Sequence, residues 1–279
     1  MRNRLATILA SAAAGALVMS LVAGTSGLFR WGSDASAIQA QAGSFPRSPD
    51  GKPNMNGIWQ AFTTAGWDLE DHNAQKGEAA GQSIVEGGSI PYQPWALAKK
   101  QANYKTRLTA DPLRNCYMPG VPRVIYLPFP FEIFQTPELT LIAYEYNHLV
   151  RWLWTDGRPH PEALEFWMGE SRARWEGDTL VVDVRNHNDS TWFDAAGNFH
   201  SNELRVVERF TPVDSNHMNY EATIEDPKVF TAPWKISLPL YRRLEKNLQL
   251  LDYECLEFET PFLPWDEPPA PGLPGPPGR

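Results

Sequence analysis

RARWEGDTLVVDVR, residues 172–185, carries the pattern from which the fold class follows. Apolar and polar side chains alternate on either side of Glu176-Gly177-Asp178, and a period of two is typical of a strand with one buried face. Glycine and aspartate are common in the short connections of hairpins. The stretch therefore predicts a β-hairpin in which Trp175 and Thr179 flank a tight turn.

Similar short runs recur through the second half of the chain, with turn residues between them. We expect strands at residues 131–135, 139–146, 149–155, 172–175, 179–185, 203–210, 218–225, 234–240 and 248–255. Consecutive antiparallel strands in this number close readily into a barrel, which removes exposed edges and can enclose a ligand. The predicted fold is mainly β: an antiparallel meander over residues 131–265 that closes into a lipocalin-like barrel or a strongly curved sheet.

Residues 43–130 are expected to belong to the same domain, because about 235 residues remain after export and fit one β domain of ordinary size. Within them, residues 94–108 show the helical pattern. Gly57-Ile58-Trp59 is expected to begin the first strand. A Gly-x-Trp at this place resembles the first strand of lipocalin-like barrels, in which the tryptophan plugs one end.

Residues 1–42 have the features of an export signal. Arg2 and Arg4 precede the largely apolar, uncharged run 5–22, and Ala40-Gln41-Ala42 has the small-x-small form that a signal peptidase accepts. The alternative is a retained membrane anchor, since about 17–25 apolar residues span a bilayer. After cleavage we expect a periplasmic or secreted protein without a membrane partner. The Pro- and Gly-rich tail, residues 266–279, is expected to be disordered.

Composition narrows the partners and the redox compartment. The net charge is −8 and the basic residues do not cluster, so the electrostatic footprint of a nucleic-acid-binding protein is missing. The chain has 2 cysteines, Cys116 and Cys255, and neither lies in a C-x-x-C pair or beside a histidine. In an oxidising compartment we expect them to form a disulfide, in preference to a catalytic thiol.

Polar loops adjoin the predicted strands at residues 156–161, 186–194 and 197–201. Binding and catalytic residues are usually placed on loops at one end of a barrel. If these loops meet at one mouth, the side chains brought together are Arg158, His160, Asp189, Asp194 and His200. The alternative is that Arg158 braces a turn with Asp156 and that the histidines are solvated.

Two further candidates lie on predicted strands. Glu208 shares a face with the apolar side chains of its strand, and a buried carboxylate is either paired or has a raised pKa, which makes it a candidate acid or base. A salt bridge to an arginine on a neighbouring strand, such as Arg174, is the competing explanation. His148 joins an aromatic face if its strand is unbroken, and lies at the surface if Asn147-His148 is a turn.

A set of short motifs runs through the mature chain. They are Asp50-Gly51-Lys52-Pro53, Gly57-Ile58-Trp59, Cys116 with Pro119-Gly120-Val121-Pro122-Arg123, Asp156-Gly157-Arg158-Pro159-His160-Pro161, residues 175–183 (WEGDTLVVD), His200-Ser201, Val207-Glu208-Arg209-Phe210, and Asp226-Pro227-Lys228 with Trp234. With these motifs the chain resembles a large family of exported bacterial proteins, most of which have no assigned function. It departs from the family pattern at Ala173, where glycine is usual, and at residues 186–189, where Gly-Phe-Asn-Asp is usual. The second change places His187 in a loop suspected of function.

No motif specifies a metal or a cofactor, and we expect neither. A metal site needs three or more converging ligands, and the chain has no spacing such as H-E-x-x-H. Gly169-Glu170-Ser171-Arg172-Ala173 superficially resembles a nucleophile elbow, but that turn leads from a strand into a helix, whereas a hairpin follows here. Phosphate loops and dinucleotide fingerprints do not occur. Metal-assisted hydrolysis is therefore only a third alternative.

The leading hypothesis is an exported barrel that binds an apolar or aromatic small molecule and performs cofactor-free acid/base chemistry on it, such as hydration, isomerisation or elimination. His160 or His200 would move the proton, and Arg158 would hold an anionic group. Glu208 or Asp194 would orient the histidine. The remaining substrate-binding candidates are His148, Trp192, Asn188 and Asp189. The rival hypothesis is a non-catalytic periplasmic binding protein, in which the aromatic side chains form a transport pocket.

Overall fold

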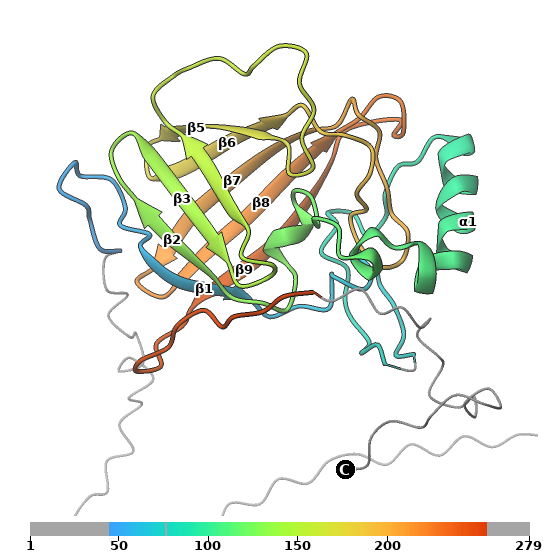
Figure 1. The fold of residues 1–279 in the computed structure, drawn as a ribbon, viewed down its shortest axis with the longest axis horizontal. Helices are drawn as coiled ribbons and strands as arrows, with labels where there is room; N and C mark the ends of the chain where they lie inside the picture. The colour runs from blue at the N-terminus through green and yellow to red at the C-terminus, as the bar shows by residue number, and fades with distance from the viewer. Residues whose placement is uncertain (1–44, 76, 256–279) are drawn as a thin grey trace, which may run out of the picture. The chain divides into compact units, whose positions relative to one another are not determined.

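In the part of the chain that the structure describes, nine strands pair in chain order and close into a barrel where β9 meets β1 (Figure 1). The computed structural model describes residues 45–75 and 77–255, and the expected export signal and Pro/Gly-rich tail lie outside them. The strands are β1 (Gly57–Ala61), β2 (Phe131–Gln135), β3 (Leu139–Tyr144), β4 (Val150–Trp154), β5 (Glu170–Glu176), β6 (Thr179–Arg185), β7 (Arg205–Asp214), β8 (His217–Glu225) and β9 (Trp234–Arg242). The prediction of a mainly β, lipocalin-like barrel is confirmed.

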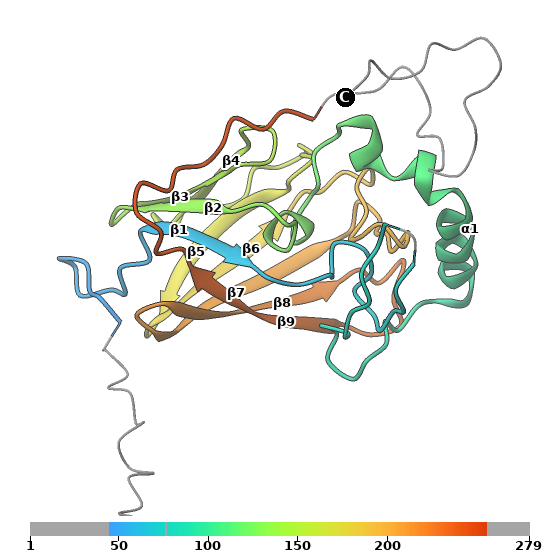
Figure 2. The ribbon, with the colours of Figure 1, turned by 90° about the horizontal axis from the view of Figure 1, so that it is seen from below.

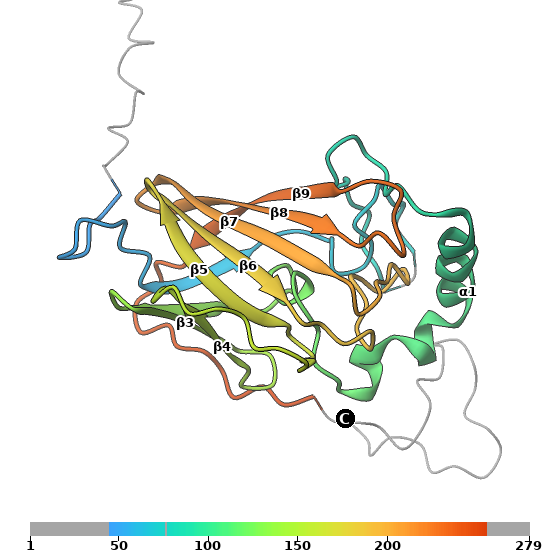
Figure 3. The same cartoon turned by 90° about the horizontal axis from the view of Figure 1, so that it is seen from above.

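One pair of neighbours departs from the antiparallel meander that the sequence predicts. β4 and β5 run parallel and pair at one position, Trp154 opposite Arg172. Residues 155–169, which we call the crossover, carry the chain from the end of β4 back to the start of β5 along the outside of the barrel (Figures 1 and 3). Parallel neighbours need a connection of about a dozen residues or more, whereas a tight turn suffices for antiparallel ones. The length of the crossover is the physical reason for the difference.

A second difference concerns the strand that closes the barrel. Residues 248–255 form no strand, and within them Tyr253 makes an isolated parallel bridge to Tyr146. β1 closes the barrel instead, because it pairs with β2 on one side and with β9 on the other. The barrel therefore extends beyond the range 131–265 predicted for the meander, because it includes β1 from the segment 43–130.

The hairpin predicted at residues 172–185 is present as β5 and β6. Glu176 pairs with Thr179, so Gly177-Asp178 is the two-residue connection. Gly177 has a φ of 61°, a left-handed conformation that glycine adopts at little cost. Side chains on the inward face of the two strands are buried in the core: Ala173, Leu180, Val182 and Val184.

The two ends of the barrel are closed differently. At one end Trp59 is fully buried, and its indole Nε1 donates to the carbonyl oxygen of Met55 at 2.8 Å. The other end, which we call the loop end, carries helix α1 (Pro94–Ala110), the 3-10 helices Pro112–Asn115 and Arg123–Ile125, and the connections 186–204 and 226–233 (Figure 2). The helix predicted at residues 94–108 is therefore confirmed.

Cys116 and Cys255 form the predicted disulfide, with their Cα atoms 5.4 Å apart. Cys116 follows the 3-10 helix Pro112–Asn115, and Cys255 is the last residue that the structure describes. The bond therefore holds the C-terminal segment against the loop end.

Candidate functional site

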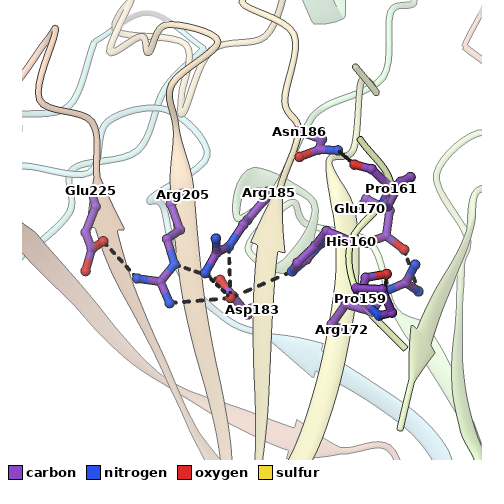
Figure 4. A network of polar contacts seen from close by, with 10 residues as sticks. All are labelled: Pro159, His160, Pro161, Glu170, Arg172, Asp183, Arg185, Asn186, Arg205 and Glu225. Carbon is purple, nitrogen blue, oxygen red and sulfur yellow. Dashed lines mark hydrogen bonds and ion pairs between the residues drawn. The ribbon is translucent and has the colours of Figure 1, made fainter. Parts of the chain in front are cut away.

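His160 lies on the outer wall of the barrel, where the crossover passes over β5 and β6 (Figure 4). Its Nδ1 is 2.6 Å from Glu170 Oε2, and its Nε2 is 3.7 Å from Asp183 Oδ2. Asp183 also accepts hydrogen bonds from Arg205 Nε at 2.8 Å and Arg185 Nε at 3.0 Å. Glu170 and Asp183 point outward because strand side chains alternate between the two faces. We call His160, Glu170, Asp183, Arg185 and Arg205 the outer-wall network. It fastens the crossover to the barrel.

Arg158 and His148 make contacts at the surface. Arg158 Nε donates to Asp156 Oδ1 at 2.9 Å, and the guanidinium lies 3.9 Å from the ring centroid of Trp154. His148 is the second residue of a turn in which Asn147 and His148 have φ values of 51° and 50°. Its Nε2 is 2.9 Å from Asp252 Oδ1. Both residues therefore fit the structural alternatives, a braced turn and a surface turn, better than substrate binding.

Glu208 is fully buried inside the barrel, as its strand position predicts, but its partner is not the expected Arg174. Arg151 of β4 donates from Nη1 to Glu208 Oε1 at 3.0 Å and from Nη2 to Oε2, and the Tyr220 hydroxyl donates to Oε1 at 2.8 Å. Arg151 Nε donates to Ser171 Oγ at 2.9 Å. Burial opposes the charged form of Arg151, yet the Glu208 carboxylate raises its pKa. Glu208 is thus held in a buried ion pair that spans the barrel.

His200 is buried at the loop end with both ring nitrogens engaged. Its Nε2 is 2.7 Å from Thr191 Oγ1, and its Nδ1 is 2.9 Å from the carbonyl oxygen of Ser201. Burial lowers the pKa of His200, so the imidazole is neutral at pH 7 and uses one nitrogen as donor and the other as acceptor. These contacts position the connection 186–204 and leave no ring nitrogen for a substrate.

His187, in the loop 186–194 suspected of function, is a second buried histidine. Its ring centroid is 5.8 Å from that of His200, and a Cβ at Gly169 would lie 2.6 Å from its Cε1. Neither ring nitrogen has a hydrogen-bond partner among the described residues. Burial, with smaller contributions from His200 and Arg151, lowers the pKa of His187 well below its usual value. Glycine at position 169 is therefore required for the close approach of this neutral ring.

Asp194 organises the loop formed by residues 193–198. Its Oδ1 accepts from the backbone N–H groups of Ala196 at 3.0 Å and Asn198 at 3.2 Å. Its Oδ2 accepts from the Leu69 N–H at 2.9 Å and from the Asn198 side-chain amide. Four donors on one fully buried carboxylate fix the loop against residue 69, which is a structural role.

The remaining candidates lie on the same connection as His200. Trp192 is half-buried and forms an isolated bridge with Phe199. Asn188 accepts a hydrogen bond from the Ser190 N–H at 3.1 Å, and Asp189 is exposed. The predicted meeting of all three polar loops at one mouth does not occur, because the crossover carries residues 156–161 along the outer wall while the other two loops stay at the loop end.

Asp194 also makes the stability of the fold depend on pH. Burial raises the pKa of Asp194 to about 7, and the neighbouring Asp68 carboxylate makes a smaller contribution in the same direction. The hydrogen-bond donors lower the pKa but do not cancel this effect. A raised carboxyl pKa means that the folded state holds the proton more tightly than the unfolded state. This contribution to stability is complete below about pH 4 and is lost as the pH rises towards about 7.

Asp68→Asn is therefore expected to weaken this pH dependence, because it removes the like charge and lowers the pKa of Asp194. For each unit by which the pKa of Asp194 falls, the free energy of unfolding should decrease by about 1.4 kcal/mol less as the pH rises from about 4 to about 7. Thermal melting at the two ends of this range measures the effect. Glu86→Gln removes an exposed carboxylate that is not among the groups acting on Asp194 and serves as the control; equal changes in both variants would contradict the assignment to Asp194.

A pocket of ≈ 290 Å³, which we call the end pocket, lies at the loop end and combines segments that are far apart in the sequence. Its walls are largely apolar and aromatic. The lining residues are Thr63, Gly66, Trp67, Asp111, Leu113, Arg114, Arg123, Tyr126, Leu127, Pro128, Phe129, Tyr146, Ala195, Tyr253 and Cys255.

Three aromatic side chains form one side of the end pocket. The ring centroid of Phe129 is 4.5 Å from that of Tyr253 and 5.5 Å from that of Tyr146. The disulfide places Tyr253 here, because Cys255 is held two residues further along the chain. On another side, the Tyr126 hydroxyl donates to the carbonyl oxygen of Phe193 at 2.8 Å. The loop that Asp194 organises is thereby tied to the pocket.

The end pocket contains one buried ion pair. Arg123 donates from Nη1 and Nη2 to the two carboxylate oxygens of Asp111, both at 2.7 Å. Arg123 Nε and the Tyr146 hydroxyl have no hydrogen-bond partner among the described residues. Arg123 is 2% exposed and Tyr146 is 4% exposed. Two polar atoms of buried pocket residues therefore remain to be satisfied.

A larger hollow of ≈ 740 Å³ lies beside the outer-wall network, lined by residues 163–165, 185–186 and 202–205. Two of its charged side chains, Arg185 and Arg205, already donate to Asp183. Ligand sites are usually concave and mostly apolar, with a few polar groups. By that criterion the end pocket is the better candidate.

Arg123, Asp111 and Tyr146 are site residues that were not predicted from the sequence. One available signal is Arg123 itself, which stands in the otherwise apolar run VPRVIYLPF at residues 121–129. A charged side chain in such a run needs a buried partner, since an unpaired charge is costly to bury. No local pattern identifies Asp111 as that partner.

Comparisons with protein-family models, curated proteins and solved structures find no match to this chain. Within residues 45–75 and 77–255, no group of three or more histidine, cysteine, aspartate or glutamate residues is placed to hold a metal ion. The same residues contain no helix long and apolar enough to cross a membrane. The interpretation of function therefore rests on the geometry of the end pocket.

Proposed function

We propose that this protein binds a small aromatic or apolar molecule in the end pocket, as a periplasmic or secreted binding protein. The observation that carries the proposal is a pocket of ≈ 290 Å³ with aromatic walls and a single buried ion pair. This volume is near the lower limit of typical ligand pockets, about 300 Å³, and suits a molecule of one or two rings. The disulfide and the expected export signal support the location.

Acid/base chemistry has less support from the geometry. His160, His200, Asp194 and Glu208 are not among the lining residues of the end pocket. His160 and Glu208 lie on opposite faces of the barrel wall, where His160 contacts Glu170 and Glu208 forms a buried ion pair with Arg151. General acid/base catalysis requires a proton-transfer group within reach of the bound substrate. The binding hypothesis needs no such group.

The naphthyl ketone dye prodan, which is neutral and fluoresces at shorter wavelength in apolar surroundings, is a suitable probe. We expect it to bind the unaltered protein with a blue shift of its emission. Phe129→Ala removes an aromatic side chain whose burial by the ligand contributes about 1.5–3 kcal/mol to the binding free energy, so the affinity should fall about ten- to a hundredfold.

Phe134→Ala is the matched control for this experiment. Phe134 is also partly exposed, but it lies on β2 and does not line the end pocket. We expect this variant to bind prodan like the unaltered protein. The proposal fails if prodan does not bind, or if Phe134→Ala weakens binding as much as Phe129→Ala does.

A further inference from the structure

The polar groups of the end pocket define the chemistry of its ligand more closely than its aromatic walls do. Among the described residues that line the pocket, Arg123 Nε and the Tyr146 hydroxyl are the buried polar atoms without a hydrogen-bond partner. A buried donor without a partner costs free energy, which a ligand that accepts its hydrogen bond recovers. The favoured ligand therefore carries a hydrogen-bond acceptor.

The charge of Arg123 is already balanced. Both terminal nitrogens of the guanidinium donate to Asp111, in a pair whose side chains are each 3% exposed. Asp111 itself lines the pocket, so an anionic ligand would meet a carboxylate beside the arginine. Bringing a second negative charge to one buried arginine is unfavourable, because like charges repel strongly where water is excluded. A neutral acceptor avoids this cost.

Tyr146 remains a donor over the whole physiological pH range. Burial raises the pKa of Tyr146 to about 12, with a smaller contribution from Tyr253, while the charge of Arg123 lowers it. Arg123 and Tyr146 both line the end pocket. Each side chain has one donor without a partner among the described residues, and the Tyr146 ring centroid lies 5.5 Å from that of Phe129 and 5.7 Å from that of Tyr253.

From these observations we infer that the end pocket selects a neutral aromatic carbonyl compound, such as an aryl ketone, aldehyde, ester or amide. The rings pack against the aromatic wall, and the carbonyl oxygen accepts from Arg123 Nε and Tyr146. This inference rests on the proposed function, since it requires the end pocket to be the binding site. Beyond the proposed function, it specifies that the ligand carries a carbonyl group and has no net charge.

Three probes with the same dimethylaminonaphthalene ring test the inference on the full chain. The first is prodan, the second lacks the carbonyl group, and the third has a carboxylate in its place. We expect prodan to bind about tenfold more tightly than either of the others, as two hydrogen bonds predict. We also expect the infrared carbonyl band of bound prodan to move to lower frequency than in an apolar solvent.

Tyr146→Phe should remove most of the preference for prodan while leaving the affinity for the carbonyl-free probe unchanged. Tyr144→Phe is the matched control, because Tyr144 is also a buried tyrosine but does not line the end pocket. Thermal melting of both variants shows whether they fold. If a variant does not fold, the comparison of the three probes on the unaltered protein still tests the inference.

The outcomes separate this inference from the proposed function. If prodan and the carbonyl-free probe bind equally, the carbonyl inference is overturned while the binding function stands. If the carboxylate binds most tightly, the charge argument is wrong. If Tyr144→Phe reduces the preference as much as Tyr146→Phe, the assignment of the donor is wrong. If none of the probes binds, the proposed function itself fails.

Discussion

Replacing Cys116 and Cys255 together by serine is expected to lower the free energy of unfolding by about 4–5 kcal/mol. The two residues are separated by 139 positions in the sequence, so the bond closes a long loop and strongly restricts the unfolded chain. Because Cys255 and Tyr253 line the end pocket, the same change should also weaken prodan binding.

Urea unfolding of the unaltered and doubly substituted proteins measures this loss. The unaltered protein unfolded under reducing conditions should match the variant, which separates the covalent bond from the change of side chain. Thiol labelling of the non-reduced protein should detect no free cysteine. Two labelled thiols, or an unchanged unfolding midpoint, would contradict the prediction.

Arg151→Met is expected to destabilise the fold by about 3–5 kcal/mol, because it leaves the Glu208 carboxylate buried without its counter-charge. Glu208 has no exposed surface, and among the described residues only the Tyr220 hydroxyl remains as its hydrogen-bond donor in this variant. Adding Glu208→Leu should recover most of the loss, since exchanging both members of a buried pair for apolar side chains is often nearly neutral. Urea unfolding of the single and double variants gives both values.

Arg174→Met is the matched control for the buried pair. Arg174 also forms an ion pair, with Glu176, but the two side chains are 59% and 40% exposed. Exposed pairs contribute about 0–1 kcal/mol, so this variant should unfold almost like the unaltered protein. A loss equal to that of Arg151→Met would show that burial does not determine the strength of the pair.

The sequence by itself determined the features that depend on neighbouring residues. Alternation over residues 172–185 and Gly177 at its centre were sufficient to predict the β5–β6 hairpin, because both the period and the turn are local. The same alternation placed Glu208 on the inward face. The cysteine count predicted the disulfide, since only one pairing within the chain is possible.

Only the tertiary structure decided which distant groups meet. Arg151 pairs with Glu208 across 57 positions because the barrel brings β4 opposite β7, and no local pattern could distinguish it from Arg174. The crossover placed His160 on the outer wall, although its loop resembles those of His200 and Asp194 in composition. The end pocket joins segments from residue 63 to residue 255. Contacts of this kind depend on chain closure over long distances, whereas periodicity and turn chemistry report only on a few residues at a time.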